Sequence, residues 1–325
     1  MATYLDRILE AHRAEAARDE RPLDDLFEAA TAASPTRGFA DALAKVDPAR
    51  DGIAVISEIK RRSPSKGDLF AGLDPAVLVR QYSDGGASCV SVLTDKEFFG
   101  GSEEDLRAAR EASDLPVLRK DFTVSRRDVL DARIMGADCL LLIAAALERD
   151  ELAQFHSLAV EVGLDVLVEV HDEAELALAL DVGATLIGVN QRDLVTFAVD
   201  HERARRMGSA MPDDVIAVAE SGVRHRGDAP LPHALLQARF QRPLPPPHVR
   251  AHHRRHRLVL PRKASMRNPP SCRPQNASPP AAPPRPSSQS RAAGGAPSSA
   301  MIVHMVLACP ALSRAARENS CRSRS

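Results

Sequence analysis

The sequence is poor in aromatic residues and cysteine. It contains no tryptophan, two tyrosines and nine phenylalanines in 325 residues. Its five cysteines form no CxxC pair and have no histidine at metal-ligand spacing beside them, so neither a zinc site nor any other metal site is predicted. Cys89 and Cys139 lie inside apolar runs, where a thiol behaves as a small apolar side chain. This usage of cysteine fits a reducing cytoplasm.

The sequence also lacks signals for export and for membrane insertion. The N-terminus, MATYLDRILEAHRAEAARDE, is charged and helical in period, without the apolar stretch of a secretory signal. The apolar run MIVHMVLACPAL, from Met301, is too short to span a bilayer and contains a histidine and a proline. We therefore expect a cytoplasmic protein with no membrane contact.

Acidic residues are nearly absent from the C-terminal part of the chain. Residues 225–325 contain two acids, Asp228 and Glu318, against sixteen arginines and one lysine, so they carry a formal charge of +15, whereas residues 1–224 carry −16. The C-terminal part also holds 17 of the 24 prolines. This composition predicts a disordered Pro/Arg-rich tail and resembles GC-rich coding sequence read out of frame. Our hypothesis is a frameshift near codon 224, with a natural basic tail as the alternative.

Residues 1–224 alternate between helical and strand-like segments. The N-terminus is an amphipathic helix with Leu5, Ile8 and Leu9 on one stripe, and a second helix is predicted from about Asp24 to Lys45. Further helices open at Asp74-Pro75 and Ser125 and close at Gly85-Gly86 and Gly136. Strands are predicted at 53–59, 87–93, 116–121, 138–143, 165–170, 184–189 and 215–220.

The predicted strands are nearly continuous apolar runs, which indicates a parallel sheet buried on both faces. Seven βα units in succession favour a (β/α)8 TIM barrel that lacks its eighth strand, with a doubly wound open sheet as the alternative. We expect a helical extension over residues 1–50, an incomplete catalytic barrel over 51–224, and the tail over 225–325.

Polar residues follow six of the seven strands, at the end where barrel active sites form. Because the carboxyl ends of parallel strands share one rim, these side chains are expected to converge. They are Glu58, Lys60, Thr94, Asp95, Lys120, Asp121, Glu169, Asn190, Arg192, Glu220 and Ser221.

Six motifs in order resemble those of indole-3-glycerol-phosphate synthases. They are SEIKRRSPSKG (57–67), LTDKEFFGGS (93–102), LRKDF (118–122), LVEVHDEAEL (167–176), IGVNQRDL (187–194) and VAESGV (218–223). The resemblance spans residues 1–224 and includes an N-terminal helical extension that lies across the barrel mouth. It implies a lyase of tryptophan biosynthesis that converts 1-(2-carboxyphenylamino)-1-deoxyribulose 5-phosphate to indole-3-glycerol phosphate, with loss of CO2 and water and without cofactor or metal.

The resemblance also implies catalytic roles for four residues. Lys120 is the general acid that protonates the ketone oxygen, and Glu169 is the general base. Glu58 is a supporting carboxylate near Lys60, which holds the carboxylate of the substrate. Lys60 is expected close enough to Lys120 for like-charge repulsion to lower the pKa of Lys120.

The remaining positions match groups that bind the small anionic substrate. Asn190 and Arg192 orient the substrate and contact its anionic end, and Glu220 hydrogen-bonds the sugar hydroxyls. Phe99 forms a wall for the aromatic ring, with an ordinary core aromatic as the alternative. The phosphate finds donors at Ser63 and at the Ser221-Gly222 turn.

The sequence departs from the family after residue 223, where a further helix, an eighth strand and a Gly-Ser turn should follow. No strand followed by a glycine turn is predicted in 225–325. The edges of the first and seventh strands are then expected to stay unpaired, with half of the phosphate site lost, low stability and little activity.

Two other functions stay open. Another phosphate-binding barrel, such as phosphoribosylanthranilate isomerase, would use a Cys and an Asp at strand ends, and the EIK and KDF motifs speak against it. A nucleic-acid-binding protein would use the basic tail. That tail has Phe240 as its single aromatic, and residues 1–224 are strongly acidic. We therefore expect no nucleic-acid partner, and a monomer.

Overall fold

A computed structural model describes residues 3–46, 53–63, 67–70, 72–193, 198–200, 202–222 and 305–309. The helices are α1 (Tyr4–Ala16), α2 (Leu23–Ala32), α3 (Phe39–Ala44), α4 (Pro75–Asp84), α5 (Glu103–Ala112), α6 (Arg126–Ile134), α7 (Arg149–Glu161), α8 (Glu173–Asp181), α9 (Arg203–Gly208) and the 3-10 turn η1 (Ala144–Ala146). The strands are β1 (Ala54–Ile59), β2 (Arg62–Ser63), β3 (Gly67–Asp68), β4 (Cys89–Leu93), β5 (Val117–Lys120), β6 (Cys139–Ile143), β7 (Asp165–Val170), β8 (Leu186–Asn190), β9 (Ile216–Glu220) and β10 (Met305–Cys309).

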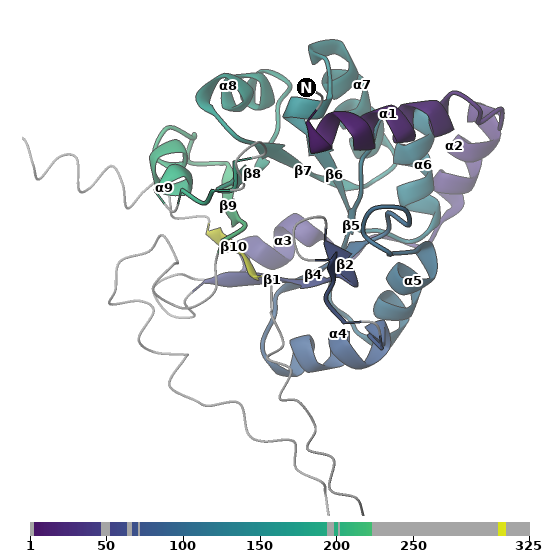
Figure 1. The fold of residues 1–325 in the computed structure, drawn as a ribbon, viewed down its shortest axis with the longest axis horizontal. Coiled ribbons are helices and arrows are strands. Elements are labelled where there is room, and N and C mark those ends of the chain that lie inside the picture. Colours follow the sequence, from purple (N-terminus) through teal and green to yellow (C-terminus); the bar gives the residue numbers. More distant parts are fainter. Residues whose placement is uncertain are drawn as a thin grey trace, which may run out of the picture. The chain divides into compact units, whose positions relative to one another are not determined.

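Seven of these strands run parallel in the order β1-β4-β5-β6-β7-β8-β9, with helices outside the ring (Figure 1). The predicted α/β barrel architecture is therefore confirmed, and the seven predicted strands match the observed ones within two residues at each end. In β6, the successive residues Leu140, Leu141 and Leu142 are all buried. Burial on both faces explains why this strand is a continuous apolar run.

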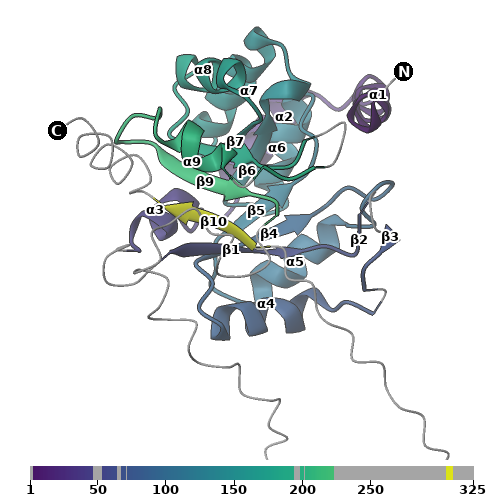
Figure 2. The same cartoon turned by 60° about the vertical axis from the view of Figure 1, so that its left-hand side comes forward.

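The ring is closed by β10, which lies between β1 and β9 (Figure 2). It runs antiparallel to both neighbours, pairing Ala54 with Ala308 on one side and Ala219 with Leu307 on the other. As predicted, the part of the chain that the structure describes contains no parallel eighth strand. The prediction that β1 and β9 keep unpaired edges is nevertheless wrong, because exposed backbone N–H and C=O groups on both edges accept a strand in either direction. Within the predicted disordered tail, residues 305–309 form β10, and the other residues of 225–325 lie outside the described ranges.

The predicted helix from Asp24 to Lys45 is two helices, α2 and α3. Pro35 stands between them, and Gly38, with a φ of 69°, precedes the first residue of α3. A proline disfavours helical backbone in the residue before it, and a left-handed residue cannot continue a right-handed helix. The boundaries predicted for α4 and α6 are confirmed: the side chain of Asp74 accepts from Ala76 N, and that of Ser125 from Asp128 N.

The N-terminal extension contacts both ends of the barrel. At the amino ends of the strands, backbone groups of Phe39 and Ala40, in α3, bond Cys89 in β4 and Asp165 in β7. At the carboxyl ends, α1 contacts the loops after β4 and β5 through His12. α1 thus contacts the carboxyl end of the barrel at these loops, and its expected crossing of the mouth stays a prediction. None of the described helices is long and apolar enough to cross a membrane.

Candidate active site

Four strands bring polar side chains together at the carboxyl end of the ring. Lys120, the last residue of β5, donates from Nζ to Glu169 Oε2 of β7 at 2.7 Å and to Glu220 Oε2 of β9 at 3.0 Å. Asn190, the last residue of β8, donates from Nδ2 to Glu169 Oε1 at 2.9 Å. Glu169, Asn190 and Glu220 are buried, and Lys120 is half-buried. The structure thus joins four of the residues that the sequence places at strand ends.

The prediction of a lowered pKa for Lys120 is wrong. Burial by itself lowers the pKa of Lys120, but the charges of Glu169 and Glu220, with Glu58 farther away, raise it above its usual range. Two carboxyl groups within hydrogen-bond distance favour the charged ammonium group, and their effect outweighs that of burial. Lys120 is therefore held in its charged form.

The two carboxyl groups that share Lys120 differ in acidity. Burial raises the pKa of Glu169, but Lys120, His171 and the hydrogen bond from Asn190 lower it to about 2. For Glu220, burial and the neighbouring charge of Glu169 outweigh Lys120 and raise the pKa to about 7. Two carboxylates beside one cation cannot both ionise easily, so the site holds a base and a weak acid side by side.

Gly188, in β8, makes room for Glu220. A Cβ atom at position 188 would lie 1.9 Å from Glu220 Oε1 and 3.0 Å from its Cδ. Glu220 Oε1 has no hydrogen-bond partner in the described residues, whereas Oε2 accepts from Lys120. A glycine at this position therefore lets the carboxyl group lie directly over the neighbouring strand.

The pair Glu58 and Lys60 forms a separate part of the rim. Lys60 Nζ donates to Glu58 Oε1, and both side chains are largely buried. The hydroxyl of Tyr82 donates to the carbonyl oxygen of Glu58 at 3.0 Å and so fixes the end of β1. The predicted closeness of these two residues is confirmed. The proposed contact between Lys60 and the substrate stays a prediction.

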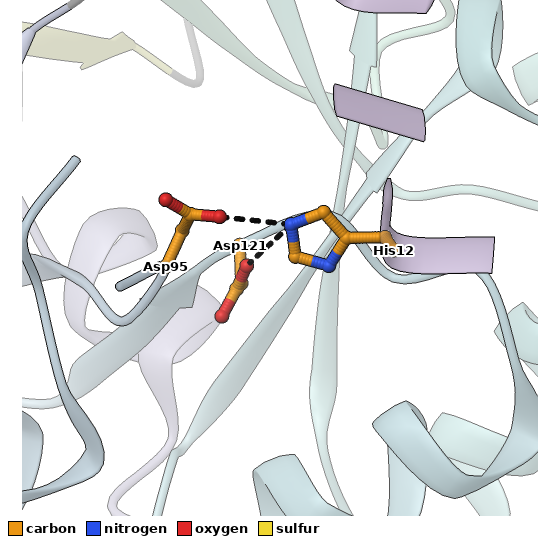
Figure 3. Close-up of side chains that lie close together, drawn as sticks. All are labelled: His12, Asp95 and Asp121. Atoms are coloured by element: carbon orange, nitrogen blue, oxygen red, sulfur yellow. Dashed lines mark hydrogen bonds and ion pairs between the residues drawn. The ribbon is translucent and has the colours of Figure 1, made fainter. Parts of the chain in front are cut away.

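The loops after β4 and β5 form a second polar cluster, with His12 of α1 pointing toward two aspartates (Figure 3). His12 Nε2 lies 2.9 Å from Asp95 Oδ2 and 4.0 Å from Asp121 Oδ1. Asp95 Oδ1 accepts from the backbone N–H groups of Phe98 and Phe99.

The aspartate oxygens of this cluster are already occupied by protein donors. Asp121 Oδ2 accepts from Thr94 and Arg119, and its Oδ1 accepts from Phe122 N. These three ligand-type residues, His12, Asp95 and Asp121, are close enough to surround a cation. A cation would have to displace those donors and would lie near the Arg119 guanidinium, so the cluster is better suited to hold α1 on the barrel.

Phe99 lies next to a second aromatic ring that the sequence analysis did not single out. The rings of Phe99 and Phe122 are 6.1 Å apart, and the ring of Phe122 is 5.4 Å from that of His12. Phe122 is the last residue of the LRKDF motif, two positions after Lys120. This closeness in the sequence could have indicated that Phe122 belongs to the site.

The residues expected to bind phosphate lie in the loops after β1, β8 and β9. Ser63 is buried, and its Oγ has no hydrogen-bond partner in the described chain. Ser221 and Gly222 have φ values of 64° and 74°. The Ser221 carbonyl accepts from Gln191 Nε2 at 3.0 Å, and Arg192 N donates to Asn190 Oδ1 at 3.0 Å. A left-handed serine is strained by about 1–3 kcal/mol, a feature that gathers at functional turns.

Two residues that the sequence analysis missed, His171 and Glu175, adjoin Glu169. His171 Nε2 lies 3.5 Å from Glu169 Oε1, and His171 Nδ1 lies 3.1 Å from Glu175 Oε2. Both belong to the LVEVHDEAEL motif. His171 comes two residues after Glu169, a spacing that places two strand residues on the same face. This spacing could have indicated that His171 belongs to the site.

Comparison with known proteins identifies the family. The family described as indole-3-glycerol phosphate synthase matches residues 5–234. The indole-3-glycerol phosphate synthase of Nocardioides sp. is 52% identical over 204 residues, which are 60% of this chain and 77% of that protein. That of Chlorobium chlorochromatii is 45% identical over 228 residues, 70% of this chain and 88% of that protein. That of Leifsonia xyli subsp. xyli is 49% identical over 211 residues, 65% of this chain and 80% of that protein. With the barrel and its charged rim, these matches show that the chain belongs to the indole-3-glycerol phosphate synthase family.

Proposed function

We propose that this chain is a carbon–carbon lyase that converts 1-(2-carboxyphenylamino)-1-deoxyribulose 5-phosphate to indole-3-glycerol phosphate, with release of CO2 and water. One observation carries the proposal beyond family membership: the ammonium group of Lys120 lies between the carboxyl groups of Glu169 and Glu220 at the carboxyl end of the strands. This arrangement supplies a cation, a base and a weak acid within hydrogen-bond distance of one another.

Lys120 acts at the ketone oxygen. As the aromatic carbon attacks the ketone, negative charge develops on that oxygen, and a nearby ammonium group both stabilises the charge and donates the proton. The carboxylate on the attacking ring carbon then leaves as CO2. The raised pKa of Lys120 supports this role, because it keeps the group protonated at neutral pH.

Glu169 acts in the dehydration that follows. It removes a proton from the ring-closed intermediate, the new hydroxyl takes up a proton from solvent and leaves as water, and the indole double bond forms. The lowered pKa of Glu169 keeps it ionised and ready to accept. Glu220 binds the sugar hydroxyls through the oxygen that lacks a partner in the described residues.

The other predicted contacts complete the binding of the substrate. Lys60 exchanges part of its contact with Glu58 for the substrate carboxylate, and Phe99 packs against the aromatic ring. The buried hydroxyl of Ser63 supports a phosphate contact, because an unpaired buried hydroxyl costs about 1–3 kcal/mol until a ligand satisfies it. Asn190, Arg192 and the Ser221-Gly222 turn orient the anionic end.

We propose further that this chain turns over more slowly than its relatives. Phosphate sites of such barrels use the loops after the last two parallel strands, and β10, the strand described beyond β9, is antiparallel. A reversed strand presents its other end at the catalytic rim, so half of the phosphate donors are replaced. The protein is proposed to act as a cytoplasmic monomer on a small anionic substrate, without metal or cofactor.

The test is an assay of the full chain for indole-3-glycerol phosphate, together with Lys120→Met, Glu169→Gln and the control Lys45→Met. Lys45 is exposed and follows α3 at the opposite end of the barrel. We expect slow turnover that falls at least 10²-fold in the two site variants and is unchanged in the control. Absence of both turnover and substrate binding in the full chain would refute the proposal.

A further inference from the structure

We propose that His171 transfers protons between Glu169 and solvent, and that Glu175 positions His171 for this transfer. The inference rests on the proposed role of Glu169 as a general base and assigns two further residues to the same reaction.

The position of His171 follows from strand geometry. Glu169 is the penultimate residue of β7, and His171 comes directly after the strand. Successive strand residues alternate between faces, so residues 169 and 171 point to the same side. The side chain of His171 is 11% exposed, against 5% for Glu169, so the imidazole is the more exposed of the two groups.

Glu175 fixes the orientation of the ring. It lies in the first turn of α8, and its Oε2 accepts from the backbone N–H of His171 at 2.7 Å and contacts Nδ1 at 3.1 Å. Asp172 caps the same helix by accepting from Glu175 N at 2.9 Å, which holds that turn in place. An ionised carboxylate only accepts hydrogen bonds, so Nδ1 must carry the proton.

With the proton on Nδ1, the lone pair of Nε2 faces Glu169. Nε2 lies 3.5 Å from Glu169 Oε1 and has no hydrogen-bond partner within the described part of the chain. The other oxygen of Glu169 faces Lys120. A buried nitrogen without a partner is costly, and here it points at the group that receives the substrate proton.

The proton balance of the transfer is simple. When Glu169 has taken a proton from the substrate, its O–H bond breaks and an N–H bond forms at His171 Nε2. Glu169 returns to the carboxylate form, and the imidazolium stands between two carboxylates. A proton then passes from the imidazolium to water, which restores the neutral ring, and no electron transfer is involved.

The charges around His171 favour this intermediate state. Burial opposes the charged ring, but Glu175 of α8, Glu169 of β7 and Glu220 of β9 together raise the pKa of His171 above its ordinary value. The imidazole is thus a better proton acceptor than it would be in water.

The first test reads the ring directly. In the ¹⁵N-labelled full chain, long-range ¹H–¹⁵N spectra report the tautomer and the pKa of each histidine, and His171→Asn identifies its signals. We expect the Nδ1–H tautomer at high pH, a lower pKa of His171 in Glu169→Gln, and a mixture of tautomers in Glu175→Gln. A dominant Nε2–H tautomer in the unmodified chain would overturn the proposal.

The second test reads the reaction. His171→Asn and Glu175→Gln should each lower kcat about 10–100-fold with little change in KM, and imidazole should partly restore kcat in His171→Ala. The matched control is His156→Asn, since His156 lies on α7, where burial alone lowers its pKa. Unchanged kcat and pH profile in His171→Asn would reject the relay, whereas loss of activity in every protein, including the unmodified chain, would reject the proposed function instead. The spectra still decide the relay in that case.

Discussion

His12 Nε2, on the N-terminal helix, lies 2.9 Å from Asp95 Oδ2, in the loop that follows β4. Asp95 in turn binds the backbone N–H groups of Phe98 and Phe99, and Tyr4 of α1 packs edge-on against the ring of Phe98. Two side-chain pairs therefore connect the helical extension to the loop that carries the proposed aromatic wall.

The attachment of α1 should depend on pH. Burial lowers the pKa of His12, but the hydrogen bond to Asp95 and the charge of Asp121 raise it above its ordinary value. A raised folded-state pKa gives stability that is complete below pH 6.5 and is lost as pH rises through the raised value. We therefore expect amide exchange in residues 4–16, corrected for its intrinsic pH dependence, to be faster at pH 8.5 than at pH 6.

Hydrogen-exchange mass spectrometry of His12→Gln checks this expectation. The variant should exchange rapidly at both pH values, because its amide cannot become charged. Arg18→Gln, an exposed change just beyond α1, serves as control and should behave like the unmodified chain. Equal exchange at both pH values in the unmodified chain would contradict the prediction.

Gly188→Ala should disturb the site from within the sheet. The new methyl group would collide with the Glu220 carboxyl group, because Glu220 Oε1 lies 1.9 Å from the place that a Cβ atom would take. Moving Glu220 removes its bond to Lys120 and should cost about 1–3 kcal/mol of unfolding free energy and most of the activity. Urea unfolding and the turnover assay measure both effects.

The control is Gly72→Ala. Gly72 is exposed in a turn, and a Cβ atom there meets nothing within 4 Å. This change should leave stability within about 0.5 kcal/mol of the parent. An equally mild effect at Gly188 would mean that Glu220 can move aside without cost.

Glu220→Gln should flatten the pH dependence of stability. The pKa of Glu220 is raised to about 7, so its contribution is complete below the unfolded value near 4.5 and is lost as pH rises through 7. Between pH 5 and pH 8 the parent should lose roughly 1–3 kcal/mol from this group that the variant does not lose. Urea unfolding at both pH values gives the difference, and parallel pH curves for parent and variant would disprove the assignment.

Leu307→Pro should weaken the closure of the barrel. Position 307 lies in the middle of β10 and pairs with Val55 on one side and Ala219 on the other. Proline removes a backbone donor and is poorly accepted inside a sheet, so we expect a loss of about 1–3 kcal/mol and greater aggregation. Light scattering and thermal unfolding measure these changes, with Ser313→Pro, beyond the strand, as control. Identical behaviour of the two variants would show that β10 does not stabilise the ring.

The strands were predictable because a strand that is buried on both faces has a continuous run of apolar residues. The run from Cys139 to Ile143 is apolar throughout, and the structure buries every residue of it. Pro35 and Gly38 could also have predicted the break between α2 and α3. The helical apolar period on both sides of them led to the prediction of one continuous helix. β10 could not be predicted, since its antiparallel pairing with β1 and β9 depends on tertiary structure and not on local pattern.

The sequence predicted which residues form the site, but it did not predict their pKa values. Lys120, Glu169 and Glu220 converge because each is the last or the penultimate residue of a parallel strand. The pKa of Lys120 was predicted in the wrong direction because distances across the ring decide which charges lie nearest. His12 was missed for the same reason, as 83 residues separate it from Asp95.

The antiparallel direction of β10 has a consequence for how the ring can be completed. The register of β10 is set by its backbone pairing with β1 and β9. The space between these two strands therefore accepts an extended segment, whichever way its chain runs. A free peptide of suitable sequence is then a competitor for that space, and the barrel becomes a candidate for strand complementation in trans.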